Sequence, residues 1–325
     1  MTRKNNESFD AYASRLFYNK QEYDLDCETI ATLLNNESDE PDRGESAYRK
    51  YYTAFNRGRD FERSKNQNGV ATRILSISDL HVPFQKPVET FHDYVGAIDI
   101  LQINGDVCDY AAISKFPKVY RNSPMEEMIM ARQYLIELIE YIRPKRVVLT
   151  YGNHDIRFQS YLAKQLDTDI LELMPATSLE LICNDGFRHY DKRQRTKIWY
   201  EPLRDVFSDI QVEYAENWYC QIGQVIFCHP LAFKSGIMKT SQDALMYFRN
   251  EGLTFTGLVM SHTHRLGEYI VGNTIMYEQG ACCHTDKMHY ADGRLTMSQK
   301  EGFLFLCLNK DGNPMREQSK LISLN

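Results

Sequence analysis

Residues 98–109 read IDILQINGDVCD, an apolar run that ends abruptly in a glycine flanked by polar side chains. Residues 98–103 predict a short strand. Gly105 permits a sharp turn that presents Asp106 directly beyond that strand. In open α/β sheets, ligands bind beyond the carboxyl ends of the strands, so this stretch predicts both a layered α/β domain and the edge at which its site lies.

The same arrangement recurs along the chain. Strands predicted at 73–78, 146–150, 224–228 and 258–260 also lead into Asp, Asn or His. The five polar endings are Asp79-Leu80-His81, Asn104-Gly105-Asp106-Val107-Cys108-Asp109, Gly152-Asn153-His154-Asp155, His229-Pro230 and Ser261-His262-Thr263-His264. We expect these five loops to converge on one place.

Strands alternate with helices in the remainder of this region. Residues 124–142 predict a long amphipathic helix that ends at Arg143-Pro144, and residues 303–308 predict a closing strand. This alternation predicts an α/β domain over residues 71–325.

The residue types at the strand ends predict a metal centre. Carboxylate, amide and imidazole groups without a thiolate suit Mn²⁺, Fe²⁺ or Zn²⁺ in a catalytic site rather than a structural zinc. Seven ligands exceed what one catalytic ion needs, because such ions keep positions open for water and substrate. Two ions that share a bridging carboxylate fit this number. The candidate ligands are Asp79, His81, Asp106, Asn153, His229, His262 and His264.

In this order the motifs resemble those of the calcineurin-like metallophosphoesterase superfamily, which are Asp-x-His, Gly-Asp-x-x-Asp, Gly-Asn-His-(Asp/Glu), a later His and Gly-His-x-His. The resemblance spans about residues 73 to 285 and implies a two-sheet β-sandwich flanked by helices. Ser261 stands where the family usually has Gly. Tyr110-Ala111 stands where protein Ser/Thr phosphatases have Arg-Gly, which argues against a protein phosphatase.

The resemblance also implies how two divalent cations would be held. The expected metal is Mn²⁺, with Fe²⁺, Zn²⁺ or Ni²⁺ as alternatives, and a hydroxide between the two ions would attack phosphorus. The first ion would be bound by Asp79, His81 and His264, the second by Asn153, His229 and His262, with Asp106 between them.

Three further residues receive roles in substrate handling. By the resemblance, His154 is not a ligand but stabilises the transition state or protonates the leaving oxygen. Asp109 would orient His154, as carboxylates orient imidazoles elsewhere. Arg157 is close enough in sequence to contact a phosphate, although a surface arginine is an equally good interpretation.

Residues 1–70 predict a separate helical module. We expect helices over 9–19, from the N-cap Asp26 onward, and from near Ser46, with a linker over 58–68. The third helix has an aromatic face (Tyr48, Tyr51, Tyr52, Phe55) and a basic face (Arg49, Lys50, Arg57, Arg59). This pattern suggests a helix-turn-helix-like, DNA-binding module. It is weakly similar to N-terminal regions of phage and prophage phosphoesterases. A packing cap or a dimerisation arm is the alternative.

A long insert precedes His229 and contains a basic cluster followed by Trp199-Tyr200. Basic residues beside aromatic rings can bind a nucleic-acid strand through phosphate contacts and stacking. The candidate substrate-binding residues are Lys192, Arg193 and Arg195, and a solvated loop is the alternative.

These features favour a nuclease or phosphodiesterase that acts on nucleic acid. Because the net charge is −6, a local basic surface or a bound metal must attract such a substrate. A phosphodiesterase or phosphatase for small nucleotides is one alternative. A DNA-binding or assembly protein with a secondary phosphoesterase domain is another.

Composition predicts the setting of the protein. No apolar run approaches the roughly 20 residues that cross a bilayer, the N-terminus is polar, and the eight cysteines form no Cys-x-x-Cys pair. We therefore expect a cytoplasmic protein with reduced thiols and no membrane partner. The sequence does not decide whether the protein forms a homo-oligomer, and it identifies neither the substrate nor the native metal.

Overall fold

The structure, a computed structural model, describes residues 2–4, 7–20, 23–38, 41–65, 69–115, 122–192, 194–288 and 299–324. The chain divides into two compact units, Met1–Asn68 and Gly69–Asn325. No helix in these described ranges is long and apolar enough to cross a bilayer.

The first unit holds three helices: α1 (Phe9–Tyr18), α2 (Cys27–Asn35) and α3 (Glu45–Lys65). Asp26 caps α2 as predicted, because its carboxylate accepts the backbone N–H of Thr29 at 2.7 Å. The three helices share a small apolar core. In the predicted aromatic face, Tyr48 is buried, but Tyr51 is 43% exposed and lies outside this core.

Two expectations for this unit need correction. The linker predicted over 58–68 is wrong for residues 58–65, because α3 continues to Lys65. A glycine inside a helix costs about 1 kcal/mol relative to alanine, so Gly58 does not end it. The connections between helices span residues 19–26 and 36–44, whereas a helix-turn-helix has a turn of roughly three to four residues. The structure therefore shows a three-helix module without that tight turn.

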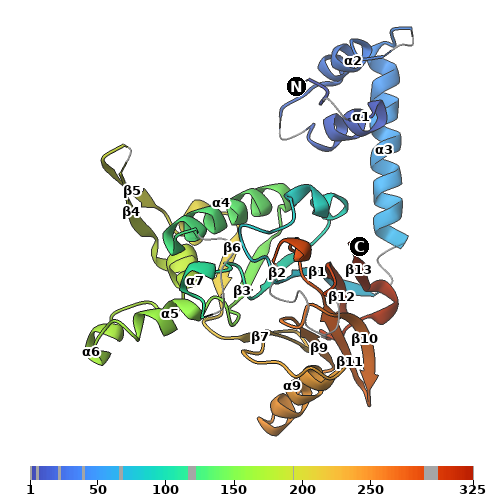
Figure 1. Ribbon diagram of the computed structural model, residues 1–325. Coiled ribbons are helices and arrows are strands. Elements are labelled where there is room, and N and C mark those ends of the chain that lie inside the picture. The colour runs from blue at the N-terminus through green and yellow to red at the C-terminus, as the bar shows by residue number, and fades with distance from the viewer. Residues whose placement is uncertain are drawn as a thin grey trace. The chain divides into compact units, whose positions relative to one another are not determined.

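The second unit is built on two larger sheets (Figure 1). The first has the order β13-β12-β1-β2-β3-β6. Strands β1 to β3 and β6 are parallel, and β12 and β13 are added antiparallel at one edge. Their bounds are β1 (Val70–Ile77), β2 (Ile100–Asn104), β3 (Arg146–Thr150), β6 (Gln211–Tyr214), β12 (Gly302–Asn309) and β13 (Lys320–Ser323).

The second sheet has the order β10-β11-β9-β8-β7. The pairs β8–β9 and β9–β11 are parallel, whereas β7 and β10 are antiparallel to their neighbours. The bounds are β7 (Tyr219–Ile222), β8 (Val225–Cys228), β9 (Gly257–Met260), β10 (Leu266–Val271) and β11 (Thr274–Gln279). The predicted two-sheet α/β fold is confirmed.

Apolar side chains from both sheets meet in a shared core, exemplified by Ile74 and Leu306 from the first sheet and Phe227 and Val259 from the second. Helix α4 (Pro124–Ile142) contributes to a core on the first sheet, and α9 (Lys239–Asn250) to a core on the second. The domain is therefore a sandwich with a helix against each outer face.

Helix α4 begins and ends as its sequence predicts. Ser123 and Glu126 exchange capping hydrogen bonds at its start, with Pro124 in the first turn. Arg143 ends the helix in the left-handed conformation, before Pro144.

The insert contains elements that periodicity did not predict. Strands β4 (Phe187–Asp191) and β5 (Thr196–Tyr200) pair as an isolated hairpin, which projects from the sheets in Figure 1. Short helices precede and follow it in the chain: α5 (Arg157–Leu162), α6 (Thr168–Leu171), α7 (Ser178–Glu180) and α8 (Leu203–Val206).

Candidate metal centre

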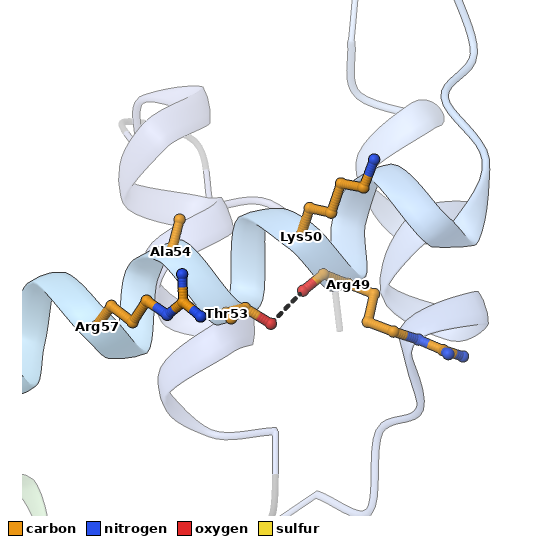
Figure 2. Close-up of a pocket in the computed structure, with 5 residues that line it drawn as sticks. All are labelled: Arg49, Lys50, Thr53, Ala54 and Arg57. Carbon is orange, nitrogen blue, oxygen red and sulfur yellow. Dashed lines mark hydrogen bonds between the residues drawn. The ribbon is translucent and has the colours of Figure 1, made fainter.

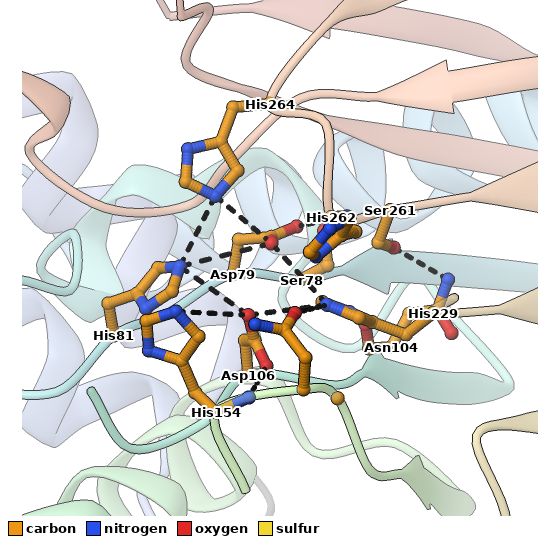
Figure 3. A network of polar contacts seen from close by, with 12 residues as sticks. Ser78, Asp79, His81, Asn104, Asp106, His154, His229, Ser261, His262 and His264 are labelled. Carbon is orange, nitrogen blue, oxygen red and sulfur yellow. Dashed lines mark hydrogen bonds and ion pairs between the residues drawn. The ribbon is translucent and has the colours of Figure 1, made fainter. Parts of the chain in front are cut away.

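The loops that follow β1, β2, β3, β8 and β9 bring their polar side chains together (Figure 3). In a first group, His264 Nε2 lies 3.1 Å from Asp79 Oδ1, and His81 Nε2 lies 3.2 Å from His264 Nε2. All three residues are buried. Their donor atoms lie within 4.8 Å of one another, so they could hold one cation.

A second group lies beside the first and consists of Asp106, His229 and His262. His229 Nε2 is 3.2 Å from Asp106 Oδ2 and 3.2 Å from Asn153 Oδ1. The same Asp106 oxygen is 3.8 Å from His81 Nε2 of the first group. Asp106 therefore lies between the two groups, and all seven predicted ligands meet in one place.

The backbone at the candidate ligands is strained. Five of them have a positive φ, a conformation that costs a residue with a side chain roughly 1–2 kcal/mol. Such strain persists only where the surrounding structure imposes it, and it clusters at functional sites. The φ values are 51° at Asp79, 45° at His81, 52° at Asp106, 79° at His262 and 49° at His264.

The two motif glycines serve different needs. Gly105 has φ +79°, which confirms the predicted turn, and a side chain there would press against the His229 ring. Gly152 has no such φ. Its Cβ would instead overlap the carboxylate and backbone nitrogen of Asp106. Gly152 is required by the close approach of two loops.

The donor set fits divalent cations. Nε2 of His262 is buried and has no hydrogen-bond partner in the described part of the chain. Burial, followed by the nearby His229, lowers the pKa of His262 to about 3, so its imidazole is neutral. Nδ1 of His229 lies 2.7 Å from the carbonyl oxygen of Asn104, which leaves Nε2 facing Asp106. Neutral imidazoles and carboxylates are the ligands that such ions need.

Without a cation, histidines balance the buried carboxylates. Burial alone would raise the pKa values of Asp79 and Asp106, but both pKa values lie below the usual value. His264 and His229 lower the pKa of Asp79. His229 and His154 lower the pKa of Asp106. Burial lowers the pKa of His229, yet Asp106 and Asp79 together raise it to about 9. His229 therefore carries a proton at neutral pH, and a bound metal would have to displace that proton.

His154 and Asp109 form a pair beside His81 of the first group and Asp106 of the second. Nδ1 of His154 is 2.8 Å from the carbonyl oxygen of Asp109 and 3.3 Å from its carboxylate. The backbone N–H of His154 donates to Asp106 at 2.7 Å. The Asp109 carboxylate is also 3.3 Å from Nδ1 of His81. Asp109 thus contacts both a candidate ligand and the candidate proton donor.

Arg157, at the start of α5, binds this pair. Its guanidinium donates to Nε2 of His154 at 2.8 Å and to the carbonyl oxygen of Asp109 at 2.8 Å. His154 Nε2 must therefore be an acceptor, and Nδ1 carries the ring proton in this state. The predicted phosphate contact of Arg157 stays a prediction.

Asp155 holds two of the ligand loops together, a role that sequence reasoning missed. Its carboxylate accepts backbone N–H groups from Asp106 at 2.8 Å, Gly152 at 2.9 Å and Val107 at 3.2 Å. The signal was present, because Asp155 is the last residue of the Gly152–Asp155 motif.

A buried polar network beneath the ligands joins the two sheets. The Asn104 amide donates to Ser261 Oγ at 2.6 Å and to the carbonyl oxygen of Cys228 at 3.0 Å. Its own oxygen accepts from Thr150 at 3.0 Å. Ser261, which departs from the family motif, is therefore accommodated by a hydrogen bond that glycine could not make.

The basic residues of the insert lie elsewhere. Lys192 and Arg195 are exposed at the tip of the projecting β4–β5 hairpin, and Arg193 lies outside the described residues. On the hairpin stem, the Arg188 guanidinium lies 5.5 Å from the centre of the Trp199 ring, which is 49% exposed. The hairpin is thus a basic and aromatic surface beside the sandwich, not part of the metal-binding groups.

A second basic surface lies on α3 of the first unit (Figure 2). Arg49, Lys50 and Arg57 are exposed there and line a shallow pocket together with Thr53 and Ala54. The hydroxyl of Thr53 donates to the carbonyl oxygen of Arg49 at 2.9 Å.

Models of two known families match this chain. The family model of the calcineurin-like phosphoesterases matches residues 72–266, more than half of the 325 residues. A YonJ N-terminal domain model matches residues 1–67. A search of curated proteins gives no match.

Solved structures similar to this chain include an archaeal phosphodiesterase, with 12% identity, a TM-score of 0.35, and coverage of 78% of this chain and 99% of that one. Vps29 of Entamoeba histolytica in complex with zinc has 14% identity, a TM-score of 0.36, and coverage of 78% and 99%. A predicted phosphoesterase of Streptococcus pneumoniae TIGR4 has 14% identity, a TM-score of 0.27, and coverage of 78% and 97%.

Proposed function

The chain belongs to the calcineurin-like phosphoesterase family, a family of metal-dependent phosphoesterases, and we propose that its substrate is a nucleic-acid phosphodiester. One observation carries the chemistry. Two groups of candidate ligands, buried except for the partly exposed His262, lie side by side, with the Asp106 carboxylate between them. This arrangement suits a reaction in which negative charge on a phosphate must be neutralised on two sides.

We assign one cation to Asp79, His81 and His264, and a second to Asn153, His229 and His262, with Asp106 shared. Mn²⁺ is the expected ion. When bound, such cations neutralise phosphoryl oxygens and lower the pKa of water.

His154 and Arg157 handle the substrate in this proposal. In the free protein, Arg157 donates to Nε2 of His154. A substrate phosphate would compete for the guanidinium, because charge-assisted hydrogen bonds to phosphate are stronger than those to a neutral imidazole. Once released, Nε2 can hold a proton at the leaving oxygen, while Asp109 keeps the ring in place.

The basic surfaces favour a polymer over a small nucleotide. Net charge is −6, yet cations and an exposed tryptophan gather on the β4–β5 hairpin, and further cations lie on the α3 face. Phosphate contacts and stacking are how proteins hold single strands. A protein in which the phosphoesterase domain is silent is disfavoured, because both groups of candidate ligands are complete.

An activity panel with Mn²⁺ tests the proposal: single- and double-stranded DNA, RNA, cyclic nucleotides and a phosphomonoester. Asp106→Ala and His229→Ala should abolish hydrolysis of every substrate in a folded protein. Activity confined to cyclic nucleotides or monoesters would establish the small-nucleotide alternative instead. Retained activity in either variant would refute the ligand assignment.

Charge substitutions test the two basic surfaces separately. Lys192→Ala with Arg195→Ala should raise KM for a long single strand several-fold, with a smaller effect on a dinucleotide. The exposed Lys310→Ala, on the connection between β12 and β13, is the matched control. Equal losses on both substrates would contradict a strand-binding role. A triple variant with alanine in place of Arg49, Lys50 and Arg57 on α3 is compared on the same long strand and dinucleotide.

A further inference from the structure

The loop between β8 and α9 begins at the candidate ligand His229 and exposes three large apolar side chains. Leu231, Phe233 and Ile237 are 47%, 53% and 66% exposed and follow His229 in the chain. We call these three residues the apolar lip. The ring centre of Phe233 lies 5.4 Å from that of His262, with an angle of 61° between the planes. The Phe233 ring thus packs against the ring of a candidate metal ligand.

The loop that carries the apolar lip is anchored. Arg265, which is only 8% exposed, donates to the carbonyl oxygens of Ser235 and Gly236 at 2.7 Å each. The backbone N–H of Lys234 donates to Thr240 Oγ1 at 2.9 Å. The exposure of the apolar lip is therefore built into the fold. Isolated exposed apolar residues are ordinary, but three on one anchored loop, one of them against a candidate metal ligand, indicate a binding surface.

We propose that the apolar lip binds the nucleobase next to the scissile phosphate, with Phe233 as its stacking platform. This inference rests on the proposed function. A phosphate held between the two groups of ligands has its nucleoside attached to it, and Phe233 lies directly beside the second group. Phe233 is 53% exposed, so its side chain is accessible to a partner from solvent.

The chemistry of the apolar lip defines its specificity. Stacking accepts every base, because each has a π-face. The three side chains offer no hydrogen bond that would read a base edge. The enzyme should therefore prefer phosphodiesters that carry a base, with little preference for its identity.

A pair of substrates isolates this contribution: thymidylyl-thymidine and the same dinucleotide with both bases replaced by hydrogen. With Mn²⁺, kcat/KM of the wild type should favour the base-bearing diester. Base stacking on an aromatic side chain is worth roughly five- to a hundredfold in binding. Phe233→Ala should reduce that preference about tenfold, and Phe233→Tyr should keep it. Ile270→Ala removes an apolar side chain of similar exposure (56%) on β10 and is the control.

The outcomes separate this inference from the proposed function. If the wild type turns over both diesters equally and Phe233→Ala changes nothing, the apolar lip has no base-binding role while the phosphodiesterase proposal stands. If neither diester is hydrolysed, the phosphodiesterase proposal fails. In that case, the affinities of the Mn²⁺-loaded protein for thymidine 5′-monophosphate and for deoxyribose 5-phosphate are compared. Tighter binding of the base-bearing ligand would support the base-binding role of the apolar lip, and equal binding would contradict it. Dissociation of a homodimer by Phe233→Ala, measured by sedimentation, would show that the apolar lip is a self-association surface and overturn the inference.

Discussion

Metal binding should expel a proton from His229, and the affinity for Mn²⁺ should therefore rise with pH up to about 9. Nε2 of His229 lies 3.2 Å from Asp106 and 3.9 Å from Asp79, and these carboxylates raise its pKa from 6.5 to about 9. That elevation corresponds to about 3 kcal/mol in favour of the protonated ring. A metal needs the lone pair that the proton occupies.

Below pH 9 the proton competes with the metal, so affinity falls by up to about tenfold for each pH unit, and by about thirtyfold at pH 7.5. Isothermal titration of Mn²⁺ into the metal-free protein, without oxygen and in buffers of different ionisation enthalpy, measures both the affinity and the released proton. An affinity that is level between pH 7 and 9, without proton release, would refute the reasoning.

Two variants sharpen this measurement. Asp106→Asn removes the carboxylate that contributes most to the raised pKa, so the pKa of His229 should fall toward 6.5. An NMR titration of the metal-free variant measures the pKa of His229 even if the variant no longer binds metal. His92 is exposed and contacts the Tyr141 hydroxyl. His92→Ala should leave the pH profile unchanged.

Three further predictions concern the loops that carry the ligands. Gly152→Ala places a methyl group against Asp106, so calorimetry should show at least tenfold weaker Mn²⁺ binding and denaturant unfolding should show a loss of about 1–3 kcal/mol. Asp155→Asn takes an acceptor from backbone N–H groups of both loops, and should lower the free energy of unfolding by about 1–3 kcal/mol; unchanged stability would contradict this role. Ser261→Gly removes one hydrogen bond of Asn104 and should cost about 1 kcal/mol, with activity within threefold of the wild type; loss of metal binding would show that Ser261 positions the ligands.

Much of the scaffold was predictable because its buried elements have strong local signals. The strand over 146–150 and the helix over 124–142 have the predicted bounds. Apolar runs between turn residues define the strand, and a capping box and a following proline define the helix. The strands of the hairpin at 187–200 were missed, because a half-exposed pair stabilised by its own register has little apolar periodicity. Helix α3 extended past Gly58 because one glycine costs less than the helix gains.

Local sequence patterns were sufficient to identify the candidate ligands, since the Asp, Asn and His residues stand at strand ends and parallel strands end at a common edge. The packing of the domain sets how these side chains group and which residues support them. It places Asp106 between two groups, Asp109 against both His81 and His154, and Arg157 on Nε2 of His154. It also sets Phe233 beside His262. These contacts join loops far apart in the chain, and their distances depend on how the two sheets pack, which no local pattern of residues encodes.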